Sequence, residues 1–346
     1  MSKDHNRSAK NSFWNKRRVL VTGGAGFVGS HLVERLVAHG AMVRVVDNLD
    51  NGSIESLKTI EDSIEWVKGD LTDPEVCAEV CAGEDTVMNL AAKVAGVAYN
   101  SKNSAEMFLN NLKIGLNVME AARLSEADRF LVVSSACVYS RDARVPTPEE
   151  DGFVNDPEPS NLGYGWAKRA LEVQGRLYAE RYGMKVGIVR PFNTYGPRDH
   201  FDAESGHVVP SLIKKIDEHK DPLVVWGDGR QTRAFVHVSD VVKGMMLVTE
   251  KYPVADPVNI GSGEEISIGH LARIIANLMG STESMVFDSS KPQGQSRRCP
   301  DLSKAKMAIG FEAEVSLEEG LNETVEWYLG RKNKTRIASE RPIAQA

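Results

Sequence analysis

Two hydroxyl groups and a thiol follow directly after an apolar run in the middle of this chain. Residues 130–133 predict a buried parallel strand, and Ser134, Ser135 and Cys137 come next. In doubly wound sheets, ligands bind outside the carboxyl ends of the strands. Because such groups could carry protons or bind a reacting oxygen there, this stretch is the first candidate for an active site.

Tyr164 and Lys168 form a second candidate pair, because residues four apart lie on one face of a helix. An ammonium beside a phenol favours the phenolate, so Tyr164 could act as a general acid and base near neutral pH. Taken alone, such a pair is more often a solvated lysine stacked on a tyrosine. A dinucleotide-binding motif earlier in the chain reverses that preference.

Three glycines provide that motif. Gly23, Gly26 and Gly29 lie between an apolar strand and a helical pattern, and the next strand ends at Asp47. Such glycines permit a tight turn and let a pyrophosphate approach the first turn of a helix. A carboxylate after the second strand accepts hydrogen bonds from the adenosine ribose and repels the extra phosphate of NADP. We therefore predict NAD as the cofactor and prefer this role of Asp47 to that of a surface residue in a turn.

The predicted cofactor site continues along the ends of the following strands. Asp70 and Leu71 end a strand and are suited to contact adenine, while small residues at Ala91 and Ala92 let the backbone lie against the cofactor. The full predicted set is Gly23, Gly26, Phe27, Val28, Gly29, Asp47, Asn48, Asp70, Leu71, Ala91, Ala92, Tyr164, Lys168 and Pro191.

Strands and helices alternate regularly over the first half of the chain and less regularly after it. This rhythm predicts an α/β fold: a Rossmann-type doubly wound parallel sheet with a smaller α/β substrate-binding domain. We expect a disordered tail at 1–17 and the NAD-binding domain at 18–192. A mainly substrate-binding domain follows at 193–330, with some return to the first domain, and a second disordered tail at 331–346.

The composition excludes several classes of protein. A net charge of −6 argues against a nucleic-acid or membrane-surface binder, and no apolar run approaches the length of a membrane span. The four cysteines follow no secretory signal, so a reducing, cytoplasmic compartment is expected. Cys77 and Cys81 have no partners at zinc-site spacing; we interpret them as buried small residues and predict no metal.

Together these motifs resemble the extended short-chain dehydrogenase/reductases that act on nucleotide sugars. The stretches that carry the resemblance are Gly23-x-x-Gly26-x-x-Gly29, Asn89-Leu90-Ala91-Ala92, Ser134-Ser135, Tyr164-x-x-x-Lys168 and Arg190-Pro191-Phe192-Asn193-x-Tyr195-Gly196-Pro197. Residues 134–139 resemble GDP-mannose 3,5-epimerases, and residues 91–94, 206–210, 225–227 and 291–294 resemble GDP-L-fucose synthases. The synthases typically use NADPH and lack an acidic residue at the position of Asp47.

The resemblance implies two chemical steps. Ser135, Tyr164 and Lys168 would serve oxidation and reduction at C4 of a sugar, while Cys137 and His207 would exchange protons at C3 or C5 on opposite faces. In other epimerases of the family a threonine replaces the cysteine and only donates hydrogen bonds. A histidine at position 207 alone is more often a loop residue that caps the following helix.

The same relatives imply the remaining ligands. The predicted substrate-binding residues are Lys93, Asn193, Trp226, Arg233 and Arg297, with the arginines on the nucleotide diphosphate. The leading hypothesis is an NAD-dependent 3,5-epimerase of a GDP-hexose that acts through a transient 4-keto intermediate, and the resemblance implies a homodimer. The alternatives are a fucose-synthase-like epimerase/reductase on a 4-keto-6-deoxy sugar, a 4-epimerase, a 4,6-dehydratase, and an idle NAD-binding sensor or scaffold.

Overall fold

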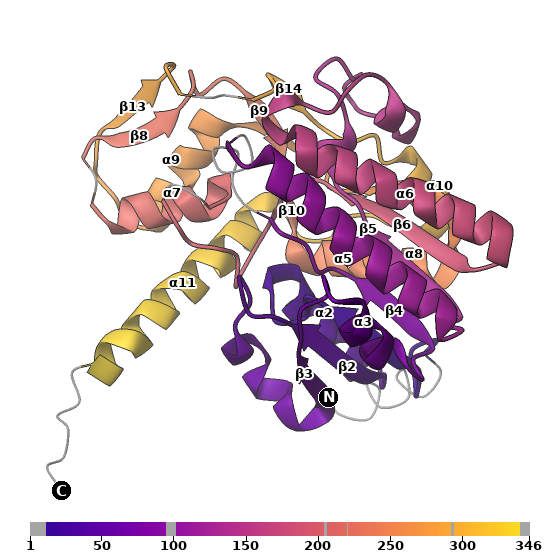
Figure 1. Ribbon diagram of the computed structural model, residues 1–346. Helices are drawn as coiled ribbons and strands as arrows, with labels where there is room; N and C mark the ends of the chain where they lie inside the picture. The colour runs from indigo at the N-terminus through magenta and orange to yellow at the C-terminus, as the bar shows by residue number, and fades with distance from the viewer. Residues whose placement is uncertain (1–11, 95–101, 204–205, 220, 292–293, 340–346) are drawn as a thin grey trace, which may run out of the picture.

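A seven-stranded parallel sheet forms the centre of the molecule, with the strand order β11-β6-β5-β4-β1-β2-β3 (Figure 1). The computed structural model describes residues 12–94, 102–203, 206–219, 221–291 and 294–339. The order runs outward from β1 in both directions, as in a doubly wound sheet, so the predicted Rossmann-type fold is confirmed. The strands are β1 (Arg18–Thr22), β2 (Met42–Asp47), β3 (Ile64–Lys68), β4 (Thr86–Asn89), β5 (Arg129–Val133), β6 (Lys185–Pro191) and β11 (Val254–Ile260).

Helices cover both faces of this sheet because successive strand side chains point to opposite sides. On one face, Val19 and Leu131 pack with the buried sides of α2 and α8; on the other, Leu20 and Phe130 pack with α3, α5 and α6. The helices of this domain are α2 (Phe27–Ala38), α3 (Pro74–Cys81), α5 (Ser104–Leu124), α6 (Leu162–Tyr182), α8 (Val238–Lys251) and α10 (Ser303–Ile309). The two cysteines of α3 are buried, and burial raises the pKa of each thiol to about 12.

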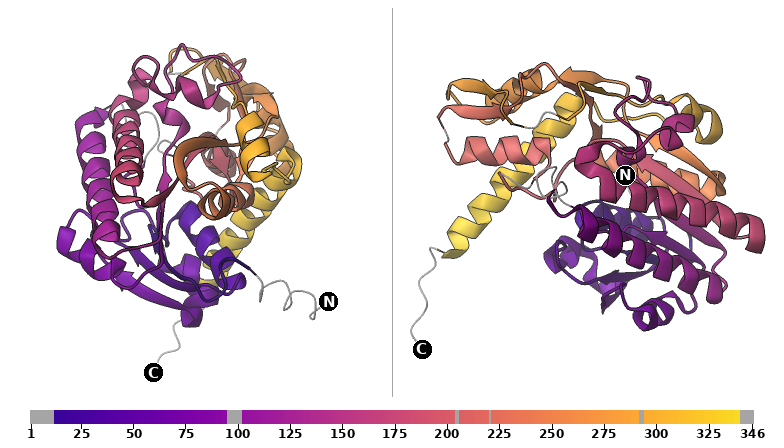
Figure 2. Two further views of the ribbon diagram at one scale, coloured as in Figure 1. Left: turned by 90° about the vertical axis from the view of Figure 1, so that its right-hand side faces the viewer. Right: turned by 45° about the horizontal axis from the view of Figure 1, so that its top comes forward.

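Short strands and three helices build a smaller second unit beside the carboxyl ends of the sheet (Figure 2). Its apolar core contains Leu212 of α7, Leu271 of α9 and Leu321 of α11. β8 pairs with β13, β9 lies between β12 and β14, and β7 pairs with β10. The elements are β7 (Thr194–Tyr195), α7 (Val208–Asp217), β8 (Leu223–Trp226), β9 (Thr232–Ala234), β10 (Val236–His237), β12 (Glu265–Ser267), α9 (Ile268–Leu278), β13 (Met285–Asp288), β14 (Arg297–Arg298) and α11 (Leu317–Ser339).

The expected tails are wrong where they overlap the described residues. Trp14 is 1% exposed and belongs to the core of the first domain, because its ring fills apolar space beside the sheet. At the other end α11 continues to Ser339, well past residue 331. Asp217 of α7 holds it there by accepting hydrogen bonds from Tyr328 (2.8 Å) and Lys332 (2.5 Å). Among the described helices, none is both long and apolar enough to cross a membrane.

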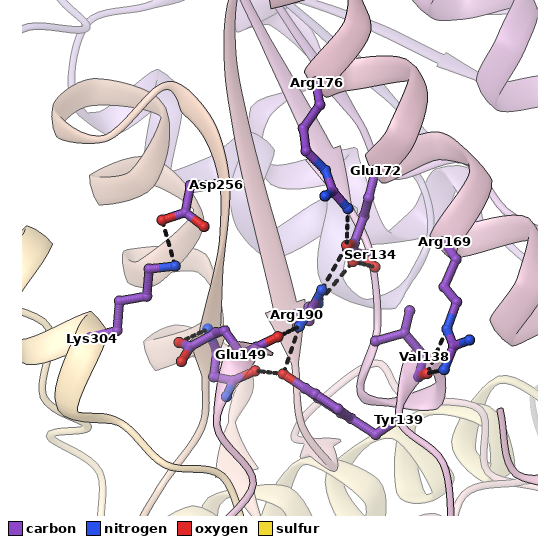
Figure 3. A network of polar contacts seen from close by, with 11 residues as sticks. Ser134, Val138, Tyr139, Glu149, Arg169, Glu172, Arg176, Arg190, Asp256 and Lys304 are labelled. Carbon is purple, nitrogen blue, oxygen red and sulfur yellow. Dashed lines mark hydrogen bonds and ion pairs between the residues drawn. The ribbon is translucent and has the colours of Figure 1, made fainter. Parts of the chain in front are cut away.

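A buried ion pair connects β5, β6 and α6 beneath the candidate active site (Figure 3). Arg190 of β6 donates to both carboxylate oxygens of Glu172 on α6, at 2.9 and 2.7 Å, and the two side chains are 1% and 0% exposed. Ser134 donates to the same carboxylate at 2.5 Å, and Arg190 also donates to the Tyr139 hydroxyl at 2.9 Å. Because every member has a partner, the desolvation of two charges is offset by a connected network.

Replacing Arg190 with methionine should lower the free energy of unfolding by about 3–5 kcal/mol, because Glu172 would remain buried without its cation. Urea denaturation followed by circular dichroism measures the change. Arg176→Met is the matched control: this side chain is 46% exposed and 4.0 Å from the same carboxylate, so its loss should cost less than about 1 kcal/mol. Equal losses in the two variants would contradict the proposed role of the buried pair.

Candidate active site

A single cavity of about 1280 Å³ runs from the carboxyl ends of the sheet strands into the second unit. Ligand cavities of proteins usually measure about 300–1000 Å³, so this one can hold a dinucleotide and a second ligand together. Every predicted cofactor-binding and catalytic residue lines it. Among the described residues, no group of three or more His, Cys, Asp or Glu side chains is arranged to hold a metal ion.

The glycine-rich turn fits a pyrophosphate. Gly23 has φ +64°, and a Cβ on Gly29 would lie 2.1 Å from the Gly23 carbonyl oxygen, so a side chain there is excluded. Helix α2 begins directly after Gly26, and no side chain caps its first turn. Backbone N–H groups at an uncapped helix start attract phosphate oxygens. The residues therefore fit the diphosphate of NAD at this end of the cavity.

Asp47 lies at the end of β2 where an adenosine ribose would bind. Its carboxylate accepts hydrogen bonds from the backbone N–H groups of Ala25 (3.1 Å) and Leu49 (2.8 Å), which fix its orientation. Burial raises its pKa, and these two hydrogen bonds oppose that rise. The carboxylate keeps lone pairs for ribose hydroxyls. Behind it, Ala91 is held close to the turn by a hydrogen bond from its N–H to Thr22 Oγ1 (3.0 Å).

Ser135, Tyr164 and Lys168 come together above this turn. Burial raises the pKa of Tyr164, and the charge of the nearby Cys137 raises it by a smaller amount. A hydrogen bond with Ser135 acts in the opposite direction and lowers this pKa. We expected Lys168 to lower that pKa, but its ammonium lies 5.4 Å from the centre of the Tyr164 ring and donates to the Val133 carbonyl at 2.7 Å. Burial lowers the pKa of Lys168 itself to about 8.

Cys137 lies in a short 3₁₀ turn, Ala136–Val138, directly after β5. Its side chain is half-buried, and its charge state affects the pKa of both Tyr164 and Lys168. The turn is held at both ends. The N–H of Cys137 donates to Ser135 Oγ at 3.1 Å, and the buried Arg169 donates twice to the Val138 carbonyl, at 2.9 and 2.7 Å.

His207 lines the same cavity from the second unit, directly before α7. Its side chain makes no capping hydrogen bond to that helix, so the structure does not support the alternative of a helix-capping histidine. Instead, Nδ1 lies 3.2 Å from Asp199 Oδ1, and this carboxylate raises the pKa of the imidazole. Sequence analysis missed Asp199, because a loop spacing of eight residues carries no periodic signal.

The predicted substrate-binding residues divide into two groups. Lys93, Asn193, Trp226 and Arg233 line the cavity. Arg297 does not: it is exposed and donates to both carboxylate oxygens of Glu265, at 3.0 and 2.8 Å. This prediction is wrong by one residue, because neighbours on a strand point to opposite sides.

Arg298 lines the cavity in place of Arg297. Burial, and after it the charge of Arg298, lower the pKa of Arg233 to about 10, so two guanidinium groups face one region. Sequence analysis also missed other residues of this wall, which are Phe201, Lys215, Gln231, Trp327, Tyr328 and Arg331.

Comparison with known proteins gives consistent matches over most of the chain. The sequence model of the NAD dependent epimerase/dehydratase family matches residues 19–261. A dTDP-4-dehydro-6-deoxy-D-allose reductase from Streptomyces sp is 35% identical, with 91% of this chain and 97% of the relative aligned. A GDP-L-fucose synthase from Escherichia coli (strain K12) is 30% identical, with coverages of 93% and 99%. The crystal structure of a UDP-glucose 4-epimerase from Thermotoga maritima with UDP-glucose is 30% identical with a TM-score of 0.82, and the match covers 91% of this chain and 99% of that one.

Replacing Asp47 with alanine should weaken NAD binding at least tenfold and narrow the preference for NAD over NADP, because the hydrogen-bond acceptor for the ribose and its repulsive charge are both lost. Titration of tryptophan fluorescence with each dinucleotide measures both constants. Asp62→Ala, at an exposed position of the adjacent 3₁₀ helix (Ile54–Ser63), should leave them unchanged. An unaltered ratio of the two constants in Asp47→Ala would exclude Asp47 as the selecting residue.

Proposed function

Because the chain belongs to the NAD-dependent epimerase/dehydratase family, we propose that it is a nucleotide-sugar epimerase acting through a transient C4 ketone. The preferred reaction is 3,5-epimerisation of a GDP-hexose. The observation that carries this proposal is the placement of Cys137 and the Asp199–His207 pair in one cavity with Ser135 and Tyr164.

Three residues of the first domain serve the chemistry at C4. These residues would work beside a bound NAD, which would supply the hydride acceptor and donor for C4. Tyr164 takes the proton of the C4 hydroxyl and later gives it back, while Ser135 holds the same oxygen through a hydrogen bond. Lys168, whose ammonium is anchored on the Val133 carbonyl, would hold the nicotinamide ribose.

A carbonyl at C4 makes the protons on C3 and C5 acidic, so inversion needs a base on one face of the sugar and an acid on the other. Cys137 comes from the end of β5 and His207 from the start of α7, in different units of the fold. The Asp199 carboxylate favours the imidazolium form of His207. We therefore assign the acid to His207 and the base to Cys137.

Two guanidinium groups suit the diphosphate of the substrate. Arg233 and Arg298 line one region of the cavity, and arginine binds phosphate oxygens with two parallel hydrogen bonds. Lys215 lies near Trp226, 5.3 Å from the ring centre, on the same wall. We assign the nucleobase to this wall and prefer guanine because of the similarity to a GDP-sugar enzyme.

A second candidate is epimerisation coupled to net reduction at C4. It is favoured by the names of two relatives, a reductase of a dTDP-4-dehydro-6-deoxy sugar and a GDP-L-fucose synthase. Simple 4-epimerisation and an idle NAD-binding role leave Cys137 and the Asp199–His207 pair without a task. Dehydration is disfavoured because Ala136 and Cys137 stand where dehydratases carry an acidic pair.

Incubation in D2O with GDP-mannose and with GDP-4-keto-6-deoxymannose tests the proposal. Proton NMR follows deuterium at C3 and C5, and absorbance follows reduced nicotinamide. An isomer without loss of cofactor supports the epimerase, whereas stoichiometric oxidation of reduced cofactor supports the coupled reductase. If neither substrate acquires deuterium at carbon, the proposed function is wrong.

Replacing Cys137 with serine should reduce deuterium incorporation from D2O by at least a hundredfold, because a hydroxyl is a much weaker base than a thiolate. The rate of deuterium incorporation into a 4-keto substrate is measured by NMR. Cys81→Ala removes a buried thiol remote from the cavity and should leave the rate unchanged. Retention of the wild-type rate by Cys137→Ser would remove the thiol from the mechanism.

We also propose that the protein forms a homodimer in the cytoplasm; all four thiols are free, as a reducing compartment requires. Helices α5 and α6 pack side by side on the outside of the sheet (Figure 1). They expose apolar residues at helical spacing, which are Leu109, Leu116, Leu162, Trp166, Val173 and Leu177. Two copies of this pair would cover the stripe as a four-helix bundle.

The variant Leu177→Glu should shift the protein from the mass of two chains to that of one, because a charge would be buried in the interface. Size-exclusion chromatography with light scattering measures the mass. Met307→Glu places the same charge on an 81%-exposed side chain of α10 and should leave the dimer intact. A wild-type protein with the mass of one chain would refute the dimer.

A further inference from the structure

A short connection after β7 touches both parts of the molecule. Arg198 and Asp199 are adjacent, but their side chains have partners in different units: Arg198 contacts α2 and the following 3₁₀ helix, and Asp199 contacts His207 before α7. We propose that Arg198 is a positioning residue that fixes Asp199, and through it His207, relative to the cofactor domain. This inference rests on the catalytic role proposed for His207.

The contacts on the cofactor side are short and partly shielded from solvent. Arg198 Nη2 lies 2.6 Å from Glu34 Oε2, with side chains 18% and 31% exposed, and Nη1 donates to the Ser56 carbonyl at 3.2 Å. His31 adds a contact of 2.9 Å between Nε2 and the carbonyl of Pro197. Burial lowers the pKa of His31 to about 4, so at neutral pH the ring is uncharged and donates through Nε2.

We call the contacts of Arg198 with Glu34 and Ser56 the clasp. The backbone of this connection is strained at Arg198, the residue that makes these contacts. Arg198 has φ +69°, a left-handed conformation that side chains other than glycine rarely adopt. Such residues persist only where the surroundings over-determine them, and they gather at functional sites. The contacts to Glu34 and Ser56 supply that constraint on one side, and the buried Asp199 supplies it on the other.

Asp199 transmits the constraint to the catalytic residue. Its side chain is 2% exposed, and Oδ1 accepts a hydrogen bond from the His200 N–H at 2.7 Å, which fixes the carboxylate plane. The two carboxylate oxygens lie 3.2 and 3.4 Å from His207 Nδ1. The negative charge of Asp199 raises the pKa of His207, whereas desolvation of the ring lowers it. Release of Arg198 would therefore loosen the group that orients and charges the imidazole.

The sign of the change in the His207 pKa separates positioning from a direct effect of charge. If Arg198 acted only through its charge, Arg198→Met would raise the pKa and Glu34→Gln would lower it. If the clasp holds Asp199 in place, both variants lower it, because the carboxylate moves away from Nδ1. Both mechanisms lower the His207 pKa in Glu34→Gln, so the direction of the change in Arg198→Met distinguishes them.

The experiment is NMR titration of the His207 Cε1–H signal in the NAD-saturated full-length protein, together with the rate of deuterium incorporation. We expect lower pKa values in both clasp variants, a loss of at least tenfold in the rate, and partial rescue by Arg198→Lys. Asp199→Asn removes the carboxylate itself, so the lower His207 pKa of this variant is the reference for complete loss of its charge. Lys58→Met breaks an exposed ion pair of the 3₁₀ helix that contains Ser56 and should leave the His207 pKa unchanged.

An unchanged or raised pKa in Arg198→Met would overturn the inference. The wild-type protein could also fail to exchange deuterium into any nucleotide sugar while both clasp variants lower the His207 pKa. That result would support the coupling and reject the proposed function. The two conclusions therefore fail separately.

Discussion

The ion pair between Arg190 and Glu172 is the interaction on which the geometry of the candidate site depends. It joins a strand to the helix that carries Tyr164 and Lys168, and it also binds Ser134, the residue before Ser135. Isolated buried charges are costly, and an apolar replacement could often match their stability. What an apolar pair could not reproduce is the directional link from one carboxylate of α6 to both Arg190 of β6 and Ser134 after β5. The pair therefore fixes positions more than it adds stability.

That fixed frame explains the state of Lys168, which lies one helical turn before Glu172. Its ammonium is buried and donates to the carbonyl of Val133, the last residue of β5. Burial lowers its pKa to about 8, while the charges of Cys137 and Glu172 favour its protonated form. At neutral pH the lysine is therefore mostly charged but poised close to its titration range. A cation in this state can respond to a change of charge on a neighbouring phenol or thiol.

The parts predicted well from the sequence are those encoded by local spacing. Apolar runs predict the strands, glycines between a strand and a helix predict the dinucleotide turn, and the four-residue spacing predicts that Tyr164 and Lys168 share a face. The parts that failed depend on distant or finer contacts. Asp199 reaches His207 only through the path of a loop, and Arg298 replaces Arg297 because of one step of strand alternation. Neither relation leaves a periodic trace in the sequence.

The candidate active site is assembled from two units with different tasks. The first domain supplies the glycine-rich turn and the residues that we assign to C4, and such parts serve many reactions on this fold. The second unit supplies His207 and Arg233, which line the same cavity and which we assign to the substrate. Net reduction requires the dinucleotide to leave after every turnover, whereas isomerisation lets it stay. A carboxylate at Asp47 that is held by two backbone N–H groups presents a rigid acceptor to the ribose, and rigidity of this kind slows release. This feature of the cofactor end supports the proposed isomerisation over the proposed alternative of net reduction, which would need faster exchange of dinucleotide at the same place.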